Sequence, residues 1–244
     1  MAKKFTSERE VLMKSLKLLL VAAAALIVIG TQGAYAETIA MKICVNNGAI
    51  CSANIMDNGA GDSNGTVGQI TWMSGLGDWT LQVNTGTGSV ILGNATLDLN
   101  FNATNTVLGS NQQLEIFFTQ TQTGASSGSF NLGLGGTLGT GQTVTYAAYT
   151  DTADTLFSTA NLVGSLSFNT SVYSGSLNGS APTDASYTLT QKITITQANG
   201  NGRAQATGDA TITPIPSVPE PASVLLLGVG LSGLAILKRM KKNS

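Results

Sequence analysis

The chain of 244 residues contains no histidine, which rules out several kinds of active site. A Ser-His-Asp or Cys-His relay needs an imidazole to carry the proton, and the common catalytic zinc sites need histidine ligands. Pairs of acidic residues remain as a means of general acid–base catalysis, as in the glycosidases. Since the sequence shows no convincing pair, we predict that the protein is not an enzyme and assign no catalytic residue.

Acidic residues in the central part of the chain are few and scattered. Glu115 alternates with apolar neighbours in a strand-like segment, so we expect it on a solvated strand face. Asp57 and Asp62, and likewise Asp151 and Asp154, lie in segments that are typical of loops. A polysaccharide hydrolase or lyase that uses Asp57 or Glu115 is kept as the third functional hypothesis.

Positive charge is scarce outside the two ends of the chain. Of the 12 lysines and arginines, only Lys42, Lys192 and Arg203 lie within residues 37–221, which hold eleven carboxylates and have a formal charge of −8. Three dispersed cations cannot neutralise enough phosphates for nucleic-acid binding, and an acidic surface is repelled by anionic membranes. We therefore expect neither nucleic acid nor an anionic lipid surface as a partner.

The N-terminal segment has the features of a signal peptide. Two lysines precede an apolar stretch, residues 18–29, and small residues stand at Ala34 and Ala36, the two positions that a signal peptidase recognises. We predict export through the Sec translocon and cleavage after Ala36. An uncleaved signal anchor is the alternative, and the sequence leaves open whether Met1 or Met13 is the initiator.

The C-terminal segment has three parts: the tripeptide Pro219, Glu220 and Pro221, an apolar run at residues 222–237 and a basic tail at residues 238–244. The prolines keep the tripeptide extended and accessible. As a helix the apolar run would span about 24 Å, enough to hold the chain in a membrane transiently. The positive-inside rule then keeps the tail in the cytoplasm and the tripeptide outside. The alternative is an ordinary single-pass anchor.

This combination of tripeptide, short apolar segment and basic end resembles the PEP-CTERM sorting signal of Gram-negative, biofilm-forming bacteria. The resemblance covers about a tenth of the chain and concerns where the protein goes, since the bodies that carry such signals vary widely. It implies a precursor anchored transiently in the inner membrane and processed at the Pro219-Glu220-Pro221 motif by an exosortase-type membrane peptidase. It also implies delivery to the outer cell surface or the extracellular matrix.

The body between these signals has the periodicity of β-strands. Within residues 37–213, Leu97, Leu99 and Phe101 alternate with polar residues, so that one face of the segment is apolar. The same alternation recurs in five further segments: residues 114–118, 130–134, 162–168, 187–195 and 204–212. A short Pro-rich linker, residues 214–221, joins this body to the apolar run.

Two of these segments carry more specific expectations. Leu162, Leu166 and Phe168 share one parity, so we predict that all three face the core. Residues 187–196 and 204–212 flank a loop of alternating asparagine and glycine, which predicts a β-hairpin.

The fold that these patterns predict is all-β. We expect about ten or eleven short strands in a single antiparallel β-sandwich of the jelly-roll or immunoglobulin-like kind. An N-terminal signal helix and a C-terminal transmembrane helix would flank this sandwich. A β-helix is the alternative, but the sequence has no fixed internal period of the kind that solenoids require.

Cys44 and Cys51 are the only cysteines. In an exported protein a lone pair predicts a disulfide, which in so small a loop contributes about 2–3 kcal/mol to stability. A metal site built on thiolates would need more ligands than these two.

Two features could belong to a binding site. Asp57 and Asp62 lie in a Gly- and Asn-rich loop that could wrap calcium, although the same composition makes plain turns and the spacing is not that of an EF-hand. Trp72 and Trp79 could stack on sugar rings, although both share parity with apolar neighbours and so could fill the core instead. No other metal or cofactor is assigned.

These observations lead to one principal functional hypothesis. The protein is expected to be an exported structural or adhesive component of the cell surface or matrix, in a biofilm or floc. Its partners would be exopolysaccharide or further copies of itself, bound through polar strand faces and edge strands. The alternative is a secreted glycan-binding module that uses exposed aromatic residues, with or without calcium.

Overall fold

The computed structural model describes residues 38–91, 94–107, 112–123, 128–184, 186–197 and 205–215. Several predictions lie outside these residues: the signal peptide with Ala34 and Ala36, the motif at residues 219–221, the transmembrane helix at residues 222–237 and the basic tail. Within the described part of the chain, no helix is long and apolar enough to cross a membrane.

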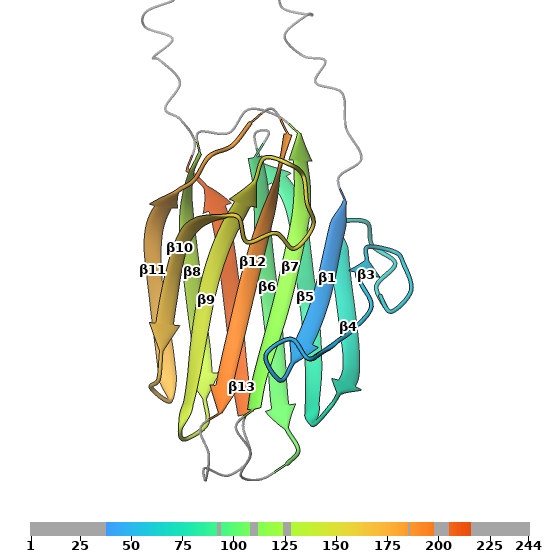
Figure 1. The fold of residues 1–244 in the computed structure, drawn as a ribbon, viewed down its shortest axis with the longest axis vertical. Helices are drawn as coiled ribbons and strands as arrows, with labels where there is room; N and C mark the ends of the chain where they lie inside the picture. Colours follow the sequence, from blue (N-terminus) through green and yellow to red (C-terminus); the bar gives the residue numbers. More distant parts are fainter. Residues whose placement is uncertain are drawn as a thin grey trace, which may run out of the picture. The chain divides into compact units, whose positions relative to one another are not determined.

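The described residues form 13 β-strands and no helix (Figure 1). In chain order the strands are β1 (Ile39–Val45), β2 (Ile50–Cys51), β3 (Ile55–Met56), β4 (Gln69–Leu76), β5 (Trp79–Ile91), β6 (Asn94–Asn105), β7 (Gln112–Thr123), β8 (Ser129–Leu138), β9 (Gln142–Asp151), β10 (Asn161–Phe168), β11 (Val172–Ser180), β12 (Ser186–Gln197) and β13 (Gln205–Pro214). The expected number of strands was lower because β2 and β3 have only two residues each, too few to show a period.

The strands form two antiparallel sheets, so the prediction of an all-β antiparallel sandwich is confirmed. Sheet A has the order β10-β9-β12-β7-β1-β2, with β3 also paired to β1, and sheet B has the order β11-β8-β13-β6-β5-β4. In Figure 1 sheet A lies in front of sheet B. From β6 onward the pairs are nested: β6 with β13, β7 with β12, β8 with β11 and β9 with β10. Such nesting, with successive strands passing between the sheets, is that of a jelly roll and favours this alternative over the immunoglobulin-like one.

The core lies between the sheets and contains the residues that the alternation placed there. Leu97, Leu99 and Phe101 of β6 are at most 1% exposed. The apolar residues of the same parity in β7, β8, β12 and β13 are buried in the same cluster: Leu114, Ile116, Phe118, Phe130, Leu132, Leu134, Tyr187, Leu189, Ile193, Ile195, Ala206, Ala210 and Ile212. Each strand therefore directs one face inward and leaves the other for solvent or loops.

The predicted hairpin between the last two strands is wrong. β12 pairs with β7 and β9 in sheet A, whereas β13 pairs with β6 and β8 in sheet B. The period of a strand shows which of its faces is apolar, but not which strand lies beside it. In a jelly roll these two consecutive strands belong to opposite sheets and share only the core.

The expected parity of β10 is also wrong at its start. Leu162 is 55% exposed and its neighbour Val163 is buried instead. The register between β10 and β9 shifts between Leu162 and Gly164. One extra residue in a strand turns the preceding side chains to the other face. Leu166 and Phe168, beyond the bulge, pack against the core as predicted.

Candidate functional site

The outward faces of the two sheets differ in how far they are covered. The loop between β9 and β10 crosses sheet A and reaches β7 and β1 (Figure 1). There the Phe157 ring meets the Phe117 ring edge-on, with centroids 6.5 Å apart, and the Lys42 Nζ lies 4.8 Å from the Phe157 centroid. Beneath this region Thr188 and Thr190 are fully buried. On sheet B, by contrast, outward-facing residues such as Asp98, Ser176 and Asp209 are exposed.

Hydroxyl, amide, carboxylate and glycine residues make up most of the outward face of sheet B. Its described members on β6, β13, β8 and β11 include Asp98, Asn100, Asn102, Thr104, Thr207, Asp209, Thr211, Asn131, Gly133, Gly135, Ser174, Ser176 and Asn178. Neighbouring strands are joined across this face by side-chain hydrogen bonds. The Asn131 Nδ2 donates to the Asn178 Oδ1 at 2.7 Å, and the Thr137 and Thr207 hydroxyls are 2.8 Å apart. Among these outward-facing residues there is no cation and no aromatic ring.

A groove of about 280 Å³ crosses the middle of this face. It is lined by Asn100, Phe101, Asn102, Gly135, Gly136, Thr207, Gly208 and Asp209. The register places Asn100 opposite Asp209 and Asp209 opposite Gly135, so the groove spans three strands that are far apart in the sequence. Consequently Asp209 lies on the middle strand, with Asn100 on one side of it and Gly135 on the other.

The glycines of the groove have two different roles. A Cβ on Gly135 would meet only ordinary contacts, the nearest being the Tyr173 carbonyl oxygen at 3.6 Å, so the absence of a side chain leaves space for a ligand. A Cβ on Gly208 would come within 2.4 Å of the Phe101 ring, so that glycine is required by the packing beneath. Tyr173 also supports the floor, since its hydroxyl donates to the Thr207 carbonyl oxygen at 2.7 Å.

Asp98 and Asp209 bring two carboxyl groups together beside the groove. Desolvation by burial, followed by the hydrogen bond and the charge repulsion from Asp209, raises the pKa of Asp98 from 3.8 to about 6. In a glycosidase the two carboxyl groups lie at least about 5 Å apart so that the scissile bond or a water fits between them. Since Asp98 and Asp209 are directly hydrogen-bonded, they share a proton rather than flank a substrate bond.

This arrangement suits a neutral ligand with many hydroxyl groups. Asn100 and Asn102 each offer a donor and an acceptor, Thr207 offers a hydroxyl, and Asp209 offers an acceptor. A shallow site with a few convergent polar groups can orient such a ligand. None of the described residues that line the groove is a lysine or arginine that could pair with phosphate, sulfate or carboxylate.

Trp72 and Trp79 are part of the core, not of the surface. Their side chains are 9% and 1% exposed, and both belong to the buried cluster between the sheets. The core interpretation of these residues is therefore the correct one. Neither ring presents a face on which a sugar could stack.

Asp57 and Asp62 serve to organise their own loop. The Asp62 carboxylate accepts hydrogen bonds from the backbone amides of Asn58, Asn64 and Thr71 at 2.8–2.9 Å, and Asp57 accepts one from Gly68 at 2.9 Å. This bonding is typical of a plain Asx-rich turn. Among the described residues, no three His, Cys, Asp or Glu side chains gather so that they could hold a metal ion.

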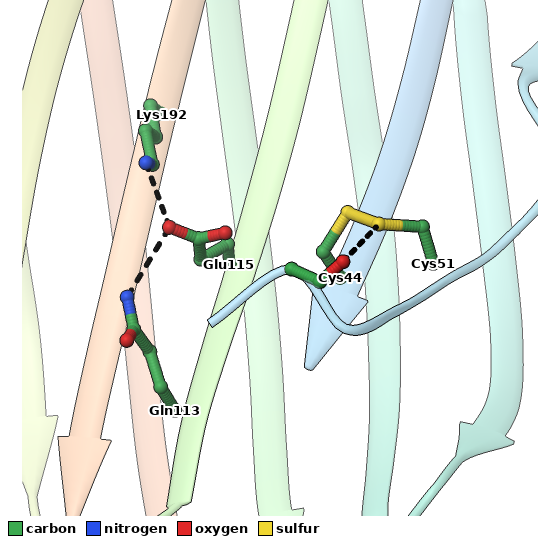
Figure 2. Close-up of polar contacts among 6 residues, drawn as sticks. Cys44, Cys51, Gln113, Glu115 and Lys192 are labelled. Atoms are coloured by element: carbon green, nitrogen blue, oxygen red, sulfur yellow. Dashed lines mark hydrogen bonds and ion pairs between the residues drawn. A yellow bond between two sulfur atoms is a disulfide. The ribbon is translucent and has the colours of Figure 1, made fainter. Parts of the chain in front are cut away.

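The expectation of a solvated Glu115 is wrong. Its side chain lies on the outward face of β7, as predicted, but only 11% of it is exposed. Figure 2 shows the reason: Lys192 of the adjacent strand β12 forms an ion pair with it at 2.7 Å, and the Gln113 Nε2 donates to it at 3.2 Å. Glu115 is therefore engaged in a structural ion pair.

The predicted disulfide between Cys44 and Cys51 is present (Figure 2). The two residues are directly opposite each other in the β1–β2 ladder. The turn between them places Asn46, Asn47 and Gly48 in the left-handed region, with φ of 56°, 57° and 81°. Asparagine and glycine adopt this conformation more readily than other residues, which explains the composition of the turn.

The residues of the groove were not singled out from the sequence. Asn100, Asn102, Thr207 and Asp209 were visible only as the polar members of alternating segments. Their strands lie about 100 residues apart in the chain, and the pairing of β6 with β13 is what brings them together. The signal that could have drawn attention to them is the group of glycines in β8, at positions 133, 135 and 136, because glycine inside a strand often marks a close approach of a ligand or of another backbone.

The comparison with protein families bears on this chain, whereas the comparisons with single proteins and structures do not. No curated protein sequence matches it. Among solved structures, TmCBM61 in complex with β-1,4-galactotriose is 8% identical, with 56% of this chain and 88% of that chain covered at a TM-score of 0.29. The N-terminal cellulose-binding domain of β-1,4-glucanase C from Cellulomonas fimi is 13% identical, with 57% and 90% covered at a TM-score of 0.31.

A third similar structure, the glycoside hydrolase domain of Endo-D from Streptococcus pneumoniae R6, is 11% identical, with 62% of this chain and 22% of that chain covered at a TM-score of 0.33. TM-scores of 0.29 to 0.33 are too low for these likenesses to support an inference about the present chain. The family comparison is different. Residues 217–239 match the PEP-CTERM protein-sorting motif, over the tripeptide, the apolar run and the start of the basic tail. The chain is therefore a PEP-CTERM domain-containing protein, which implies that it is exported and sorted by an exosortase.

Proposed function

We propose that this exported protein is a structural or adhesive component of the outer cell surface or extracellular matrix, and that it binds neutral polysaccharide through the groove on sheet B. The observation that carries this proposal is the groove itself. It is open over Gly135, and its hydrogen-bonding groups come from Asn100, Asn102, Thr207 and Asp209.

The chemistry of the groove supports a polyhydroxylated ligand. Sugar hydroxyls act as both donors and acceptors, so they can pair with the amides of Asn100 and Asn102 and with the carboxylate of Asp209 at the same time. Around the groove, the outward face carries the same kinds of polar groups on β8 and β11. An extended polysaccharide chain could therefore lie across several strands. Binding would depend on many weak contacts, as suits an adhesive role.

Charge supports a neutral ligand over an anionic one. Asp209 lines the groove, Asp98 lies beside it, and the span 37–221 has a formal charge of −8. A uronate or sulfate on the ligand would be repelled at this face, and the lining residues that the structure describes include no lysine or arginine to offset the repulsion. We propose that binding is independent of calcium, because the Asp57 and Asp62 carboxylates already bond to loop amides.

A groove-filling substitution tests the proposal. The probe is affinity electrophoresis of the protein, purified from an exporting host, in gels that contain hydroxyethylcellulose, galactan, dextran or alginate. We expect at least one neutral polymer to retard the protein, with and without EDTA, and alginate to leave it unaffected. Gly135→Val should abolish the retardation, because a Cβ at this position meets only ordinary van der Waals contacts and the side chain then occupies the groove.

The matched control is Gly65→Val, since Gly65 has no atom within 4 Å of the position of a Cβ and lies in the loop before β4. This variant should be retarded like the parent protein. Retardation of Gly135→Val to the same degree as the parent, or no retardation by any neutral polymer, would contradict a binding groove on sheet B.

A further inference from the structure

The free edge of β11 is unlike the other edges of the two sheets. At two of those edges the strands carry a bulge, between Leu162 and Gly164 in β10 and between Ile70 and Trp72 in β4. At the remaining edge the short strands β2 and β3 cover β1. β11 pairs with β8 over all of its 9 residues without a shift in register. No described strand pairs with its other side, and Figure 1 shows β11 at the margin of the sheet.

This edge also lacks the charges that usually protect an edge strand. Residues 155–183, which include β10 and β11, contain no Asp, Glu, Lys or Arg. Proteins normally prevent edge strands from pairing with other chains by means of charges, prolines or bulges. The span 37–221 has a formal charge of −8, so two copies repel each other over most of their surface. The free edge of β11 is therefore a place where two copies can pair without bringing like charges together.

The backbone of β11 directs every second residue away from the sheet. The amide of Leu138 donates to the Ser171 carbonyl oxygen, and the amide of Ala181 donates to the Gly128 carbonyl oxygen, both at 2.9 Å. In an antiparallel pair such bonds recur at every second residue, so the odd-numbered residues of β11 bond to β8. The even-numbered residues direct their N–H and C=O groups to the free edge: Val172, Ser174, Ser176, Asn178 and Ser180. Of these groups, the Val172 carbonyl oxygen accepts a hydrogen bond from the Thr170 hydroxyl at 2.9 Å. The side chains of all five are exposed.

We propose that two copies of the protein pair antiparallel through β11, with a two-fold axis at Ser176, and so join their B sheets into one continuous sheet. In this register Ser176 is opposite Ser176 of the second copy, and Ser174 is opposite Asn178. Each facing pair consists of even-numbered residues, so the outward N–H and C=O groups of one copy meet those of the other.

No two large side chains of β11 face each other in this register. On the face toward the core, Tyr173 is opposite Gly179 of the second copy and Leu177 is opposite Gly175. The strands can therefore approach to the spacing of a normal sheet, about 4.8 Å. The space over both glycines is filled by β10 of the same copy, since a Cβ on Gly175 would come within 2.7 Å of the Phe168 ring and one on Gly179 within 2.1 Å of the Val163 carbonyl oxygen. On the outer face the serines and Asn178 are small enough to add no steric barrier.

Cysteine substitution tests the register. Ser176→Cys places two thiols across the axis with Cα atoms about 5.5 Å apart, within disulfide range. Ser180→Cys lies on the same edge and face but would be about 27 Å from its equivalent. The native cysteines are already paired with each other. On oxidation of the full protein, non-reducing gels should show a covalent dimer for Ser176→Cys and none for Ser180→Cys. Crosslinking of both variants, or of neither, would overturn the proposal.

Charge substitution tests the axis independently. Ser176→Lys and Ser176→Asp each place two like charges opposite each other, which should raise the dissociation constant of the dimer about fivefold in sedimentation equilibrium. An equimolar mixture of the two variants should restore association, because Lys then meets Asp. The control is Thr80→Lys, at an exposed position on β5, and this variant should associate like the parent protein. A parent protein that stays monomeric, or a mixture no tighter than the separate variants, would refute pairing at Ser176.

Discussion

Asp98 links the groove on sheet B to the pH of the surroundings. Burial and the neighbouring Asp209 raise the pKa of its carboxyl group to about 6 in the folded protein, whereas the unfolded chain ionises near the ordinary value of 3.8. The folded state therefore holds a proton in a range where the unfolded state has lost it. The stability that comes from this group grows as the pH falls through about 6 and becomes constant below about 4.

The Asp98→Asn variant should lose this pH dependence. Asparagine is neutral at every pH, so the midpoint of urea unfolding should change less between about pH 7.5 and pH 5 than it does in the parent protein. At about pH 7.5 the variant should also be more stable than the parent, because one of two adjacent carboxylates is removed. The control is Asp184→Asn, at an exposed carboxylate elsewhere. An equal pH dependence in the parent and in Asp98→Asn would contradict the assignment.

At the scale of elements, the sequence predicted which face of an alternating strand is buried, but it did not predict which strands pair. The alternation in β6, with Leu97 and Phe101 inward, correctly separated buried from outward residues because burial follows a period of two whatever the partner strand. The same pattern could not show that β12 and β13 lie in different sheets. Nor could it show that Lys192 covers Glu115, because that contact depends on the β7–β12 pairing across more than 70 residues of chain.

The groove on sheet B could not be predicted from the sequence for the same reason. Gly135, Asp209 and Asn100 become neighbours only when β8, β13 and β6 are placed in that order. Aromatic residues were the natural signal for sugar binding, but Trp72 and Trp79 fill the core, where their large apolar area stabilises the sandwich. The bulge in β10 likewise depends on the register with β9, which no local pattern around Leu162 reveals.

The disulfide fastens β2 to β1 and so keeps one edge of sheet A covered. We expect the double substitution Cys44→Ala with Cys51→Ala to lower the free energy of unfolding by about 2–3 kcal/mol, because the short loop is no longer closed in the unfolded chain. Urea unfolding of the parent protein, the double variant and the parent in reductant measures this change. The reduced parent should behave like the double variant. Unchanged stability in both would mean that the bond does not constrain the unfolded chain.

At the scale of the whole molecule, the expected signals lie at the two ends and the proposed functions lie in the body. The sorting motif at residues 217–239 implies export, and both proposed binding surfaces belong to the acidic sandwich. The groove and the free edge of β11 lie in the same sheet, yet they use different chemical groups. Binding in the groove uses outward-facing side chains, whereas pairing at the edge uses backbone N–H and C=O groups. A protein that binds polysaccharide and also pairs with itself could crosslink polymer chains, which is what an adhesive matrix component must do.

Processing of both ends is the prediction that concerns the full chain. Intact-mass spectrometry of the protein released by its native host should give a species that begins at Glu37 and lacks the apolar run at residues 222–237 and the basic tail. Glu220→Ala alters the tripeptide on which exosortase-type processing depends, so this variant should keep its tail and stay in the membrane fraction. Thr213→Ala, seven residues upstream on β13, should be processed like the parent. Extracellular protein that still carries Lys241 and Lys242 would show that the motif does not act as a cleavage signal here.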